Sequence, residues 1–100
     1  MPIQDITGKV DFSTPFKPRI LHTDEHAKVV LVCLSPGQAI PPHPEENQAF
    51  FNVLEGSGVI VTDEGELPVI AGNLVTVPRG GKRGIRAEGG NLVVLALAVL

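Results

Sequence analysis

One short segment of the sequence has residue types that suit metal or acid–base chemistry. His43 stands between two prolines in the segment PGQAIPPHPEENQAFF, and Glu45 follows it two residues later. An imidazole and a carboxylate are both ligands for divalent metals, and a histidine can transfer a proton near neutral pH. Two protein ligands are fewer than the three of most catalytic metal sites. The segment therefore indicates a polar site at His43 and Glu45, with or without a metal.

Strands must position these two side chains. Eleven glycines and nine prolines interrupt the chain, and the short runs between them are rich in Val, Ile and Leu. Such runs predict an all-β sandwich or barrel. Gly65 in TDEGEL and the glycines of EGGNL at residues 88–92 predict hairpin turns. Residues two apart on a strand share a face, so we expect His43 and Glu45 to point into one cavity.

The chain divides into two unequal parts. A length of 100 residues predicts one domain. Residues 1–19 contain three prolines and are expected to form an extended arm, whereas residues 20–100 form the barrel domain. Phe12 and Phe16 of the arm are expected to pack on the barrel or to reach a neighbouring chain.

The last run of the sequence favours a partner subunit. Residues 92–100, LVVLALAVL, are apolar at every position. Such a pattern is typical of a strand that is covered on both faces. Because no helix is predicted that would cover the outer face, we expect a homodimer in which a second copy does so.

Composition narrows the cellular setting. The chain is 43% hydrophobic and 19% charged, which is typical of a globular protein. Its single cysteine, Cys33, lies in an apolar run and requires no oxidising compartment. There is no signal-like start, and the longest apolar run is far shorter than the roughly 20 residues of a membrane helix. We expect a cytoplasmic protein that does not enter a membrane.

A basic segment raises the question of nucleic-acid binding. Arg79, Lys82, Arg83 and Arg86 lie within eight residues. No aromatic residue interleaves with them, and the net charge of the chain is −3. We therefore expect no nucleic-acid partner.

The spacing around His43 resembles the small single-domain cupins. Their first motif reads Gly, five residues, His-x-His, three or four residues, Glu, six residues, Gly. Here Gly37 is followed after five residues by His43, and Gly56 closes the motif. The second histidine position holds Glu45 and the glutamate position holds Ala49.

A second cupin motif follows in the right order. It reads Gly, five residues, Pro-x-Gly, two residues, His, three residues, Asn. Gly72, Pro78 and Gly80 match it, whereas the histidine position holds Arg83 and the asparagine position holds Ala87. The resemblance implies a jelly-roll β-barrel of two antiparallel sheets around a ligand-sized cavity. In the family three histidines and one glutamate hold a divalent metal, and only His43 matches one of those four positions.

Arg83 argues against a resident metal. A guanidinium has no lone pair to offer and stays charged. We expect it to form a forked hydrogen bond with the Glu45 carboxylate or with an anionic ligand. By the same alternation as Ala49, Phe51 is expected to line the cavity and narrow it. We therefore expect no cofactor; a divalent transition metal on His43 and Glu45 is the alternative.

These residues favour a binding protein and leave two other classes open. The first expectation is a metal-poor cupin whose cavity, lined by His43, Glu45, Phe51 and Arg83, binds a small acid or sugar. The second is a metal-dependent isomerase, lyase or dioxygenase that uses His43 and Glu45 with a third ligand from His22 or His26. The third is a structural or regulatory dimer whose cavity is plugged by Phe51 and its neighbours.

Overall fold

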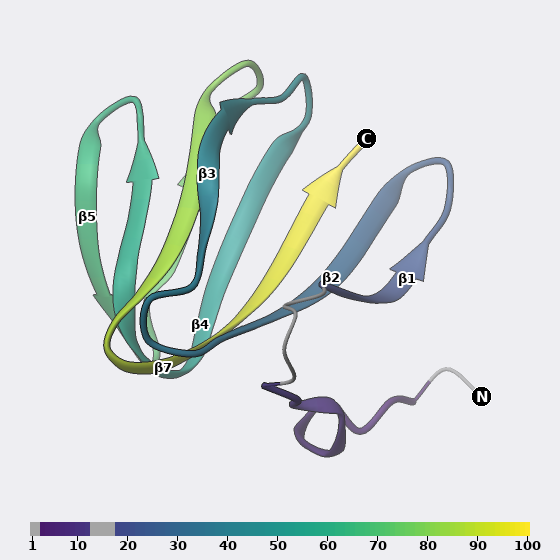
Figure 1. Ribbon diagram of the computed structural model, residues 1–100. Coiled ribbons are helices and arrows are strands. Elements are labelled where there is room, and N and C mark those ends of the chain that lie inside the picture. Colours follow the sequence, from purple (N-terminus) through teal and green to yellow (C-terminus); the bar gives the residue numbers. More distant parts are fainter. Residues whose placement is uncertain (1–2, 13–17) are drawn as a thin grey trace.

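The computed structural model describes residues 3–12 and 18–100. In this part of the chain a 3-10 helix precedes seven strands that pair only in antiparallel fashion, which confirms the all-β prediction (Figure 1). No described helix is long and apolar enough to cross a membrane. The elements are η1 (Thr7–Lys9), β1 (Arg19–Thr23), β2 (Ala27–Leu34), β3 (Ala39–Pro44), β4 (Gln48–Thr62), β5 (Gly65–Ile70), β6 (Leu74–Val77) and β7 (Lys82–Val99).

Two long strands, β4 and β7, belong to both layers of the barrel. The first half of β4 pairs with β6 and with the second half of β7, which pairs in turn with β2. The second half of β4 pairs with β5 and with the first half of β7, which also pairs with β3. Figure 1 shows the two layers joined along the bottom of the view and open toward the top. This curled arrangement is the jelly-roll that the cupin resemblance implies.

The expected hairpin at residues 88–92 is wrong. These residues belong to β7, which continues through them from Lys82 to Val99. Gly89 and Gly90 have φ angles of 82° and 157°, and Ser57 is the only β4 residue that lies opposite the stretch between Ala87 and Leu92. The glycines therefore form a bulge at which the strand bends from one layer into the other, as Gly56 does on β4 with a φ of 81°. The predicted turn before Gly65 is present and joins β4 to β5.

The core fills the space between the two layers. It is built from alternate residues of the long strands, including Val53, Ile60, Ile85 and Val94, which are at most 3% exposed. Burying apolar surface at about 25 cal/mol per Å² is the main stabilising contribution in such a barrel.

The N-terminal arm covers part of the outer surface. Ile6, Val10 and Phe12 pack against a second buried cluster that contains Leu31 and Val93. The arm is thus the cover for this part of the last strand, a role that the sequence had suggested for a second subunit. Phe16, the other aromatic residue expected to pack, lies outside the described residues.

Candidate functional site

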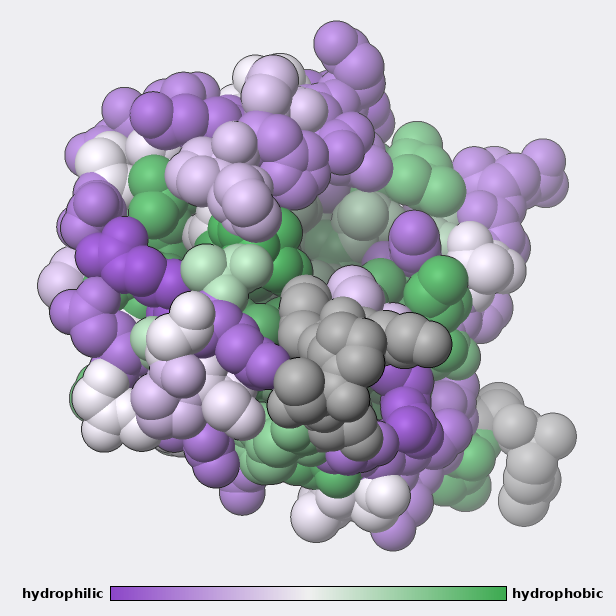
Figure 2. All heavy atoms as spheres, in the orientation of Figure 1, coloured by the Kyte–Doolittle hydropathy of each residue, from purple (hydrophilic) through white to green (hydrophobic). Residues whose placement is uncertain are grey.

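A cavity of about 590 Å³ lies between the layers at their open end. Figure 2 shows apolar surface gathered in the hollow on this face, with hydrophilic side chains around it. The structure places all four predicted residues, His43, Glu45, Phe51 and Arg83, in the lining of this cavity. Its floor and walls are otherwise largely apolar, with Val30, Ile40 and Ile85 among the side chains that line them.

His43 and Glu45 face each other at the rim. His43 is the next-to-last residue of β3, which contains Pro41, Pro42 and Pro44. Gly84 on β7 lets this strand approach closely, because a Cβ there would lie 2.7 Å from the Pro42 nitrogen. His43 Nδ1 donates to the carbonyl oxygen of Pro41 at 3.0 Å. Its Nε2 lies 3.2 Å from Glu45 Oε1, and both side chains are 48% exposed. The pair therefore presents one acid–base couple to the cavity.

Arg83 does not pair with the Glu45 carboxylate, which was one of the two partners expected from the sequence. Its side chain is buried, with 6% of the residue exposed. Nε and Nη2 donate to the carbonyl oxygen of Gly81, Nη2 also donates to that of Pro78 at 3.2 Å, and Nη1 donates to Asn47 Oδ1 at 3.0 Å. Its hydrogen bond to Glu45 is longer and goes from Nη2 to the backbone oxygen, at 3.4 Å.

The loop geometry explains this change of partner. Gly80 N donates to the Glu45 carbonyl oxygen at 2.7 Å, which holds the β6–β7 loop against the β3–β4 loop. The guanidinium is thereby surrounded by fixed carbonyl oxygens, and these satisfy its planar donors without a carboxylate. Arg83 thus joins two loops beneath the rim.

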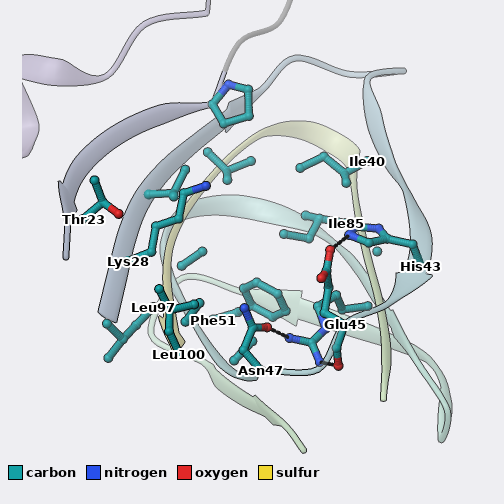
Figure 3. Close-up of a pocket in the computed structure, with 18 residues that line it drawn as sticks. Thr23, Lys28, Ile40, His43, Glu45, Asn47, Phe51, Ile85, Leu97 and Leu100 are labelled. Atoms are coloured by element: carbon teal, nitrogen blue, oxygen red, sulfur yellow. Dashed lines mark hydrogen bonds and ion pairs between the residues drawn. The ribbon is translucent and has the colours of Figure 1, made fainter. Parts of the chain in front are cut away.

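Asn47 is a lining residue that the sequence reasoning missed. Arginine only donates hydrogen bonds, so its bond to Asn47 must be accepted by the amide oxygen. The amide nitrogen of Asn47 is then directed into the cavity, as Figure 3 shows. Asn47 could have been predicted as a lining residue from the alternation of positions 43, 45, 47, 49 and 51, because all five residues line the cavity.

The donor set falls short of the family's metal site. His43 Nε2 and Glu45 Oε1 are close enough to bind one ion together. Ala49 offers no donor atom, and the Arg83 guanidinium carries a positive charge and no lone pair. Among the residues that the structure describes, no three His, Cys, Asp or Glu side chains are grouped to hold a metal. Two protein ligands do not fit a complete catalytic site.

His22 and His26 do not supply the missing ligand. His22 lies in β1 and His26 in the β1–β2 turn, and neither lines the cavity. His22 Nε2 contacts Asp24 Oδ2 at 2.7 Å, while His26 is exposed beside Glu25. The hydrogen bond from His22, followed by backbone bonds from His26 and Ala27, lowers the pKa of Asp24 to about 2. These contacts account for both histidines as exposed residues, one near the end of β1 and one in the turn that follows.

The basic segment does not form a continuous patch. Arg83 is buried, and Arg79 donates to the backbone oxygen of Glu46. Arg86 forms ion pairs with Glu66 and Glu88 at 2.7 and 2.9 Å. The hydrogen bond and charge of Arg86 hold the pKa of Glu66 below its usual value, and the two carboxylates raise the pKa of Arg86. Three of these four cationic side chains therefore form hydrogen bonds or ion pairs with other groups of the protein.

Comparisons with known proteins agree with this geometry. A family model described as a cupin domain matches residues 30–99. The solved structure of TT1209 from Thermus thermophilus is 24% identical, with a TM-score of 0.91 and coverage of 99% of this chain and 97% of that one. An RmlC-like cupin protein from Desulfovibrio desulfuricans is 27% identical, with a TM-score of 0.87 and coverage of 99% and 96%.

A third similar structure is KdgF from a Halomonas species. It is 18% identical, with a TM-score of 0.77 and coverage of 89% of this chain and 83% of that one, so it shares the fold. No curated protein matches the chain.

Proposed function

This chain belongs to the cupin domain family, and we propose that it binds a small polar or anionic molecule in its barrel cavity without a complete metal site. The observation that carries the proposal is the open cavity of about 590 Å³ with polar side chains on an otherwise apolar lining. Its size lies in the usual range for small-molecule sites, and such sites combine apolar walls with a few well-placed polar groups.

The open cavity favours binding over a purely structural role. A structural dimer predicts that Phe51 and its neighbours plug the barrel. Phe51 is buried but forms part of the wall, and the cavity beside it extends to His43 (Figure 3). The side chains of Arg83 and Asn47 are already fixed by hydrogen bonds, so a ligand meets a partly pre-organised wall.

The donor set also favours binding over metal-dependent catalysis. An enzyme of that kind needs a third protein ligand, which neither His22 nor His26 provides in the described structure. We propose that His43 and Glu45 orient the ligand as hydrogen-bonding groups. Elemental analysis of protein purified without a metal-affinity column tests this point. A stoichiometric transition metal would overturn the metal-free part of the proposal.

A ligand screen with a cavity-filling variant tests binding itself. Small carboxylic acids and sugars are added to the protein at millimolar concentration, and saturation-transfer NMR detects those that bind. Ala96 lines the cavity, so Ala96→Phe is expected to abolish binding by occupying the space. Ala71 is exposed in the β5–β6 turn, and Ala71→Phe is the matched control that retains binding.

Two results would contradict the proposal. One is a folded wild-type protein that binds none of the probes. The other is equal binding by wild type and a folded Ala96→Phe variant, because the ligand would then occupy another surface. The backbone NMR spectrum of each variant establishes that it is folded.

A further inference from the structure

Lys28 is a cation on the inner face of the barrel. It precedes Val30 and Val32 at alternate positions of β2, and all three line the cavity. Across the sheet Lys28 lies opposite Ala98 of β7, and Ala98 lies opposite Ala49 of β4. The two alanines leave room for the long lysine side chain at this level. The ammonium is therefore positioned over the open end of the cavity, as Figure 3 shows.

No carboxylate neutralises this ammonium within the described part of the chain. The ion pairs there involve Arg19, Arg86 and the three histidines, and none includes Lys28. Glu45 is the acidic residue of the cavity lining, and it faces His43 on the opposite wall (Figure 3). An ammonium beside apolar walls loses part of its hydration. An anionic group of a bound ligand would offset this cost by forming a charged hydrogen bond with it.

A second donor, the Asn47 amide, lies directly before β4, in the same layer as Lys28 on β2. Because Arg83 holds the Asn47 amide oxygen, the Asn47 nitrogen can donate to a ligand acceptor. Apolar side chains, including Phe51, Ala96 and Ile85, line the same cavity. The cavity thus combines a cation, an apolar lining and an amide donor.

We propose that Lys28 recognises the carboxylate of a small monocarboxylic acid with an apolar body. The body contacts Phe51 and the aliphatic wall, and Asn47 donates to a second acceptor such as a keto or hydroxyl oxygen. This inference rests on the proposed ligand-binding function and assigns the charge and shape of the ligand. Lys28 is the specificity-determining residue of the site.

A carboxylate fits this site better than a phosphate ester. A phosphate presents three acceptor oxygens and about two negative charges, and proteins commonly meet it with helix N-termini or arginine forks. Here the one arginine of the lining is committed to loop oxygens, and no helix approaches the cavity in the described structure. The single positive charge of one ammonium matches the single negative charge of one carboxylate.

The test compares acids with their uncharged amides. The probes are phenylacetate, hexanoate and 4-methyl-2-oxopentanoate, each with its primary amide, and titration calorimetry measures the Kd for wild type and Lys28→Gln. The wild type is expected to bind the acids more tightly than the amides. Lys28→Gln is expected to weaken acid binding roughly tenfold and to leave amide binding unchanged, since a hydrogen bond to a charged group is lost. Lys9→Gln is the matched control, because Lys9 contacts Gln4 on the arm and does not line the cavity.

The outcomes separate this inference from the general proposal. If acids and amides bind equally well, or if Lys28→Gln binds the acids as tightly as wild type, the assignment of Lys28 is overturned while cavity binding stands. If sugars bind and neither acids nor amides do, the assignment is likewise overturned. If no acid, amide or sugar binds to folded wild-type protein, both the inference and the proposed function are overturned.

Discussion

Arg83 holds two loops together at a position where the cupin motif has a histidine. Its guanidinium contacts backbone oxygens of Pro78 and Gly81 in one loop, and Asn47 and the Glu45 backbone in the other. A buried charge of this kind is costly unless its donors are satisfied, and here fixed carbonyl oxygens satisfy them. The same contacts orient the Asn47 amide, so the residue affects the cavity without offering a metal ligand.

Removal of this guanidinium should destabilise the protein. Arg83→Met leaves the carbonyl oxygens of Pro78 and Gly81 without their charged donor, and we expect a loss of about 3 kcal/mol in the free energy of unfolding. Arg79→Met is the control in the same loop. Arg79 is exposed and makes one bond to a backbone oxygen, so its loss should cost less than about 1 kcal/mol. Urea unfolding measures both values, and equal losses would show that Arg83 does not hold the loops.

The residues of the cavity were partly predictable from alternation alone. His43, Glu45 and Phe51 were assigned to it because residues two apart share a face, and the same rule extends to Asn47 and to Lys28 through Val30 and Val32. The partner of Arg83 was not predictable. Its ligands are backbone oxygens of loops that are distant in sequence, and only the folded chain brings them together.

The two long strands depend on glycines where they bend. Gly56 lies at the bend of β4 with a φ of 81°, and a Cβ there would lie 1.7 Å from the Asn91 carbonyl oxygen on β7. This glycine therefore has two requirements, a left-handed backbone and the close approach of a neighbouring strand. The sequence showed the glycines but not the continuity of the strands, because a glycine that bends a strand and a glycine that ends one give the same local signal.

The cost of close approach can be separated from the cost of backbone strain. Gly72 has a φ of 95°, and no atom lies within 4 Å of the point that a Cβ would occupy, so Gly72→Ala should cost about 1 kcal/mol for strain alone. Gly56→Ala should cost about 2 kcal/mol more, because β4 and β7 must move apart. Thermal and urea unfolding of the two variants give the difference. If both lose the same stability, the strands at Gly56 have room that the structure does not show.

The two faces of the first layer have different surroundings. Its inner face lines the cavity and core, whereas its outer face is covered in part by Ile6, Val10 and Phe12 of the arm. Asn52 of β4 pairs with Leu95 of β7 and with Leu74 of β6, so these three side chains form one row on the outer face. Leu74 is 64% exposed. The arm therefore covers only part of the apolar surface that the last strand and its neighbours present.

We propose that a second copy of the chain covers the rest of this surface. Sedimentation velocity at micromolar concentration should then give a mass near twice the 10.6 kDa of one chain. Leu74→Lys should shift the protein toward the monomer, because an ammonium in the row with Leu95 would have to be desolvated in the interface. Ile70→Lys is the control: Ile70 is 63% exposed but lies on β5 in the other layer, so this variant should sediment like the wild type. A wild-type protein that sediments only at 10.6 kDa would show that the arm alone suffices, and an equal effect of both variants would place the interface elsewhere.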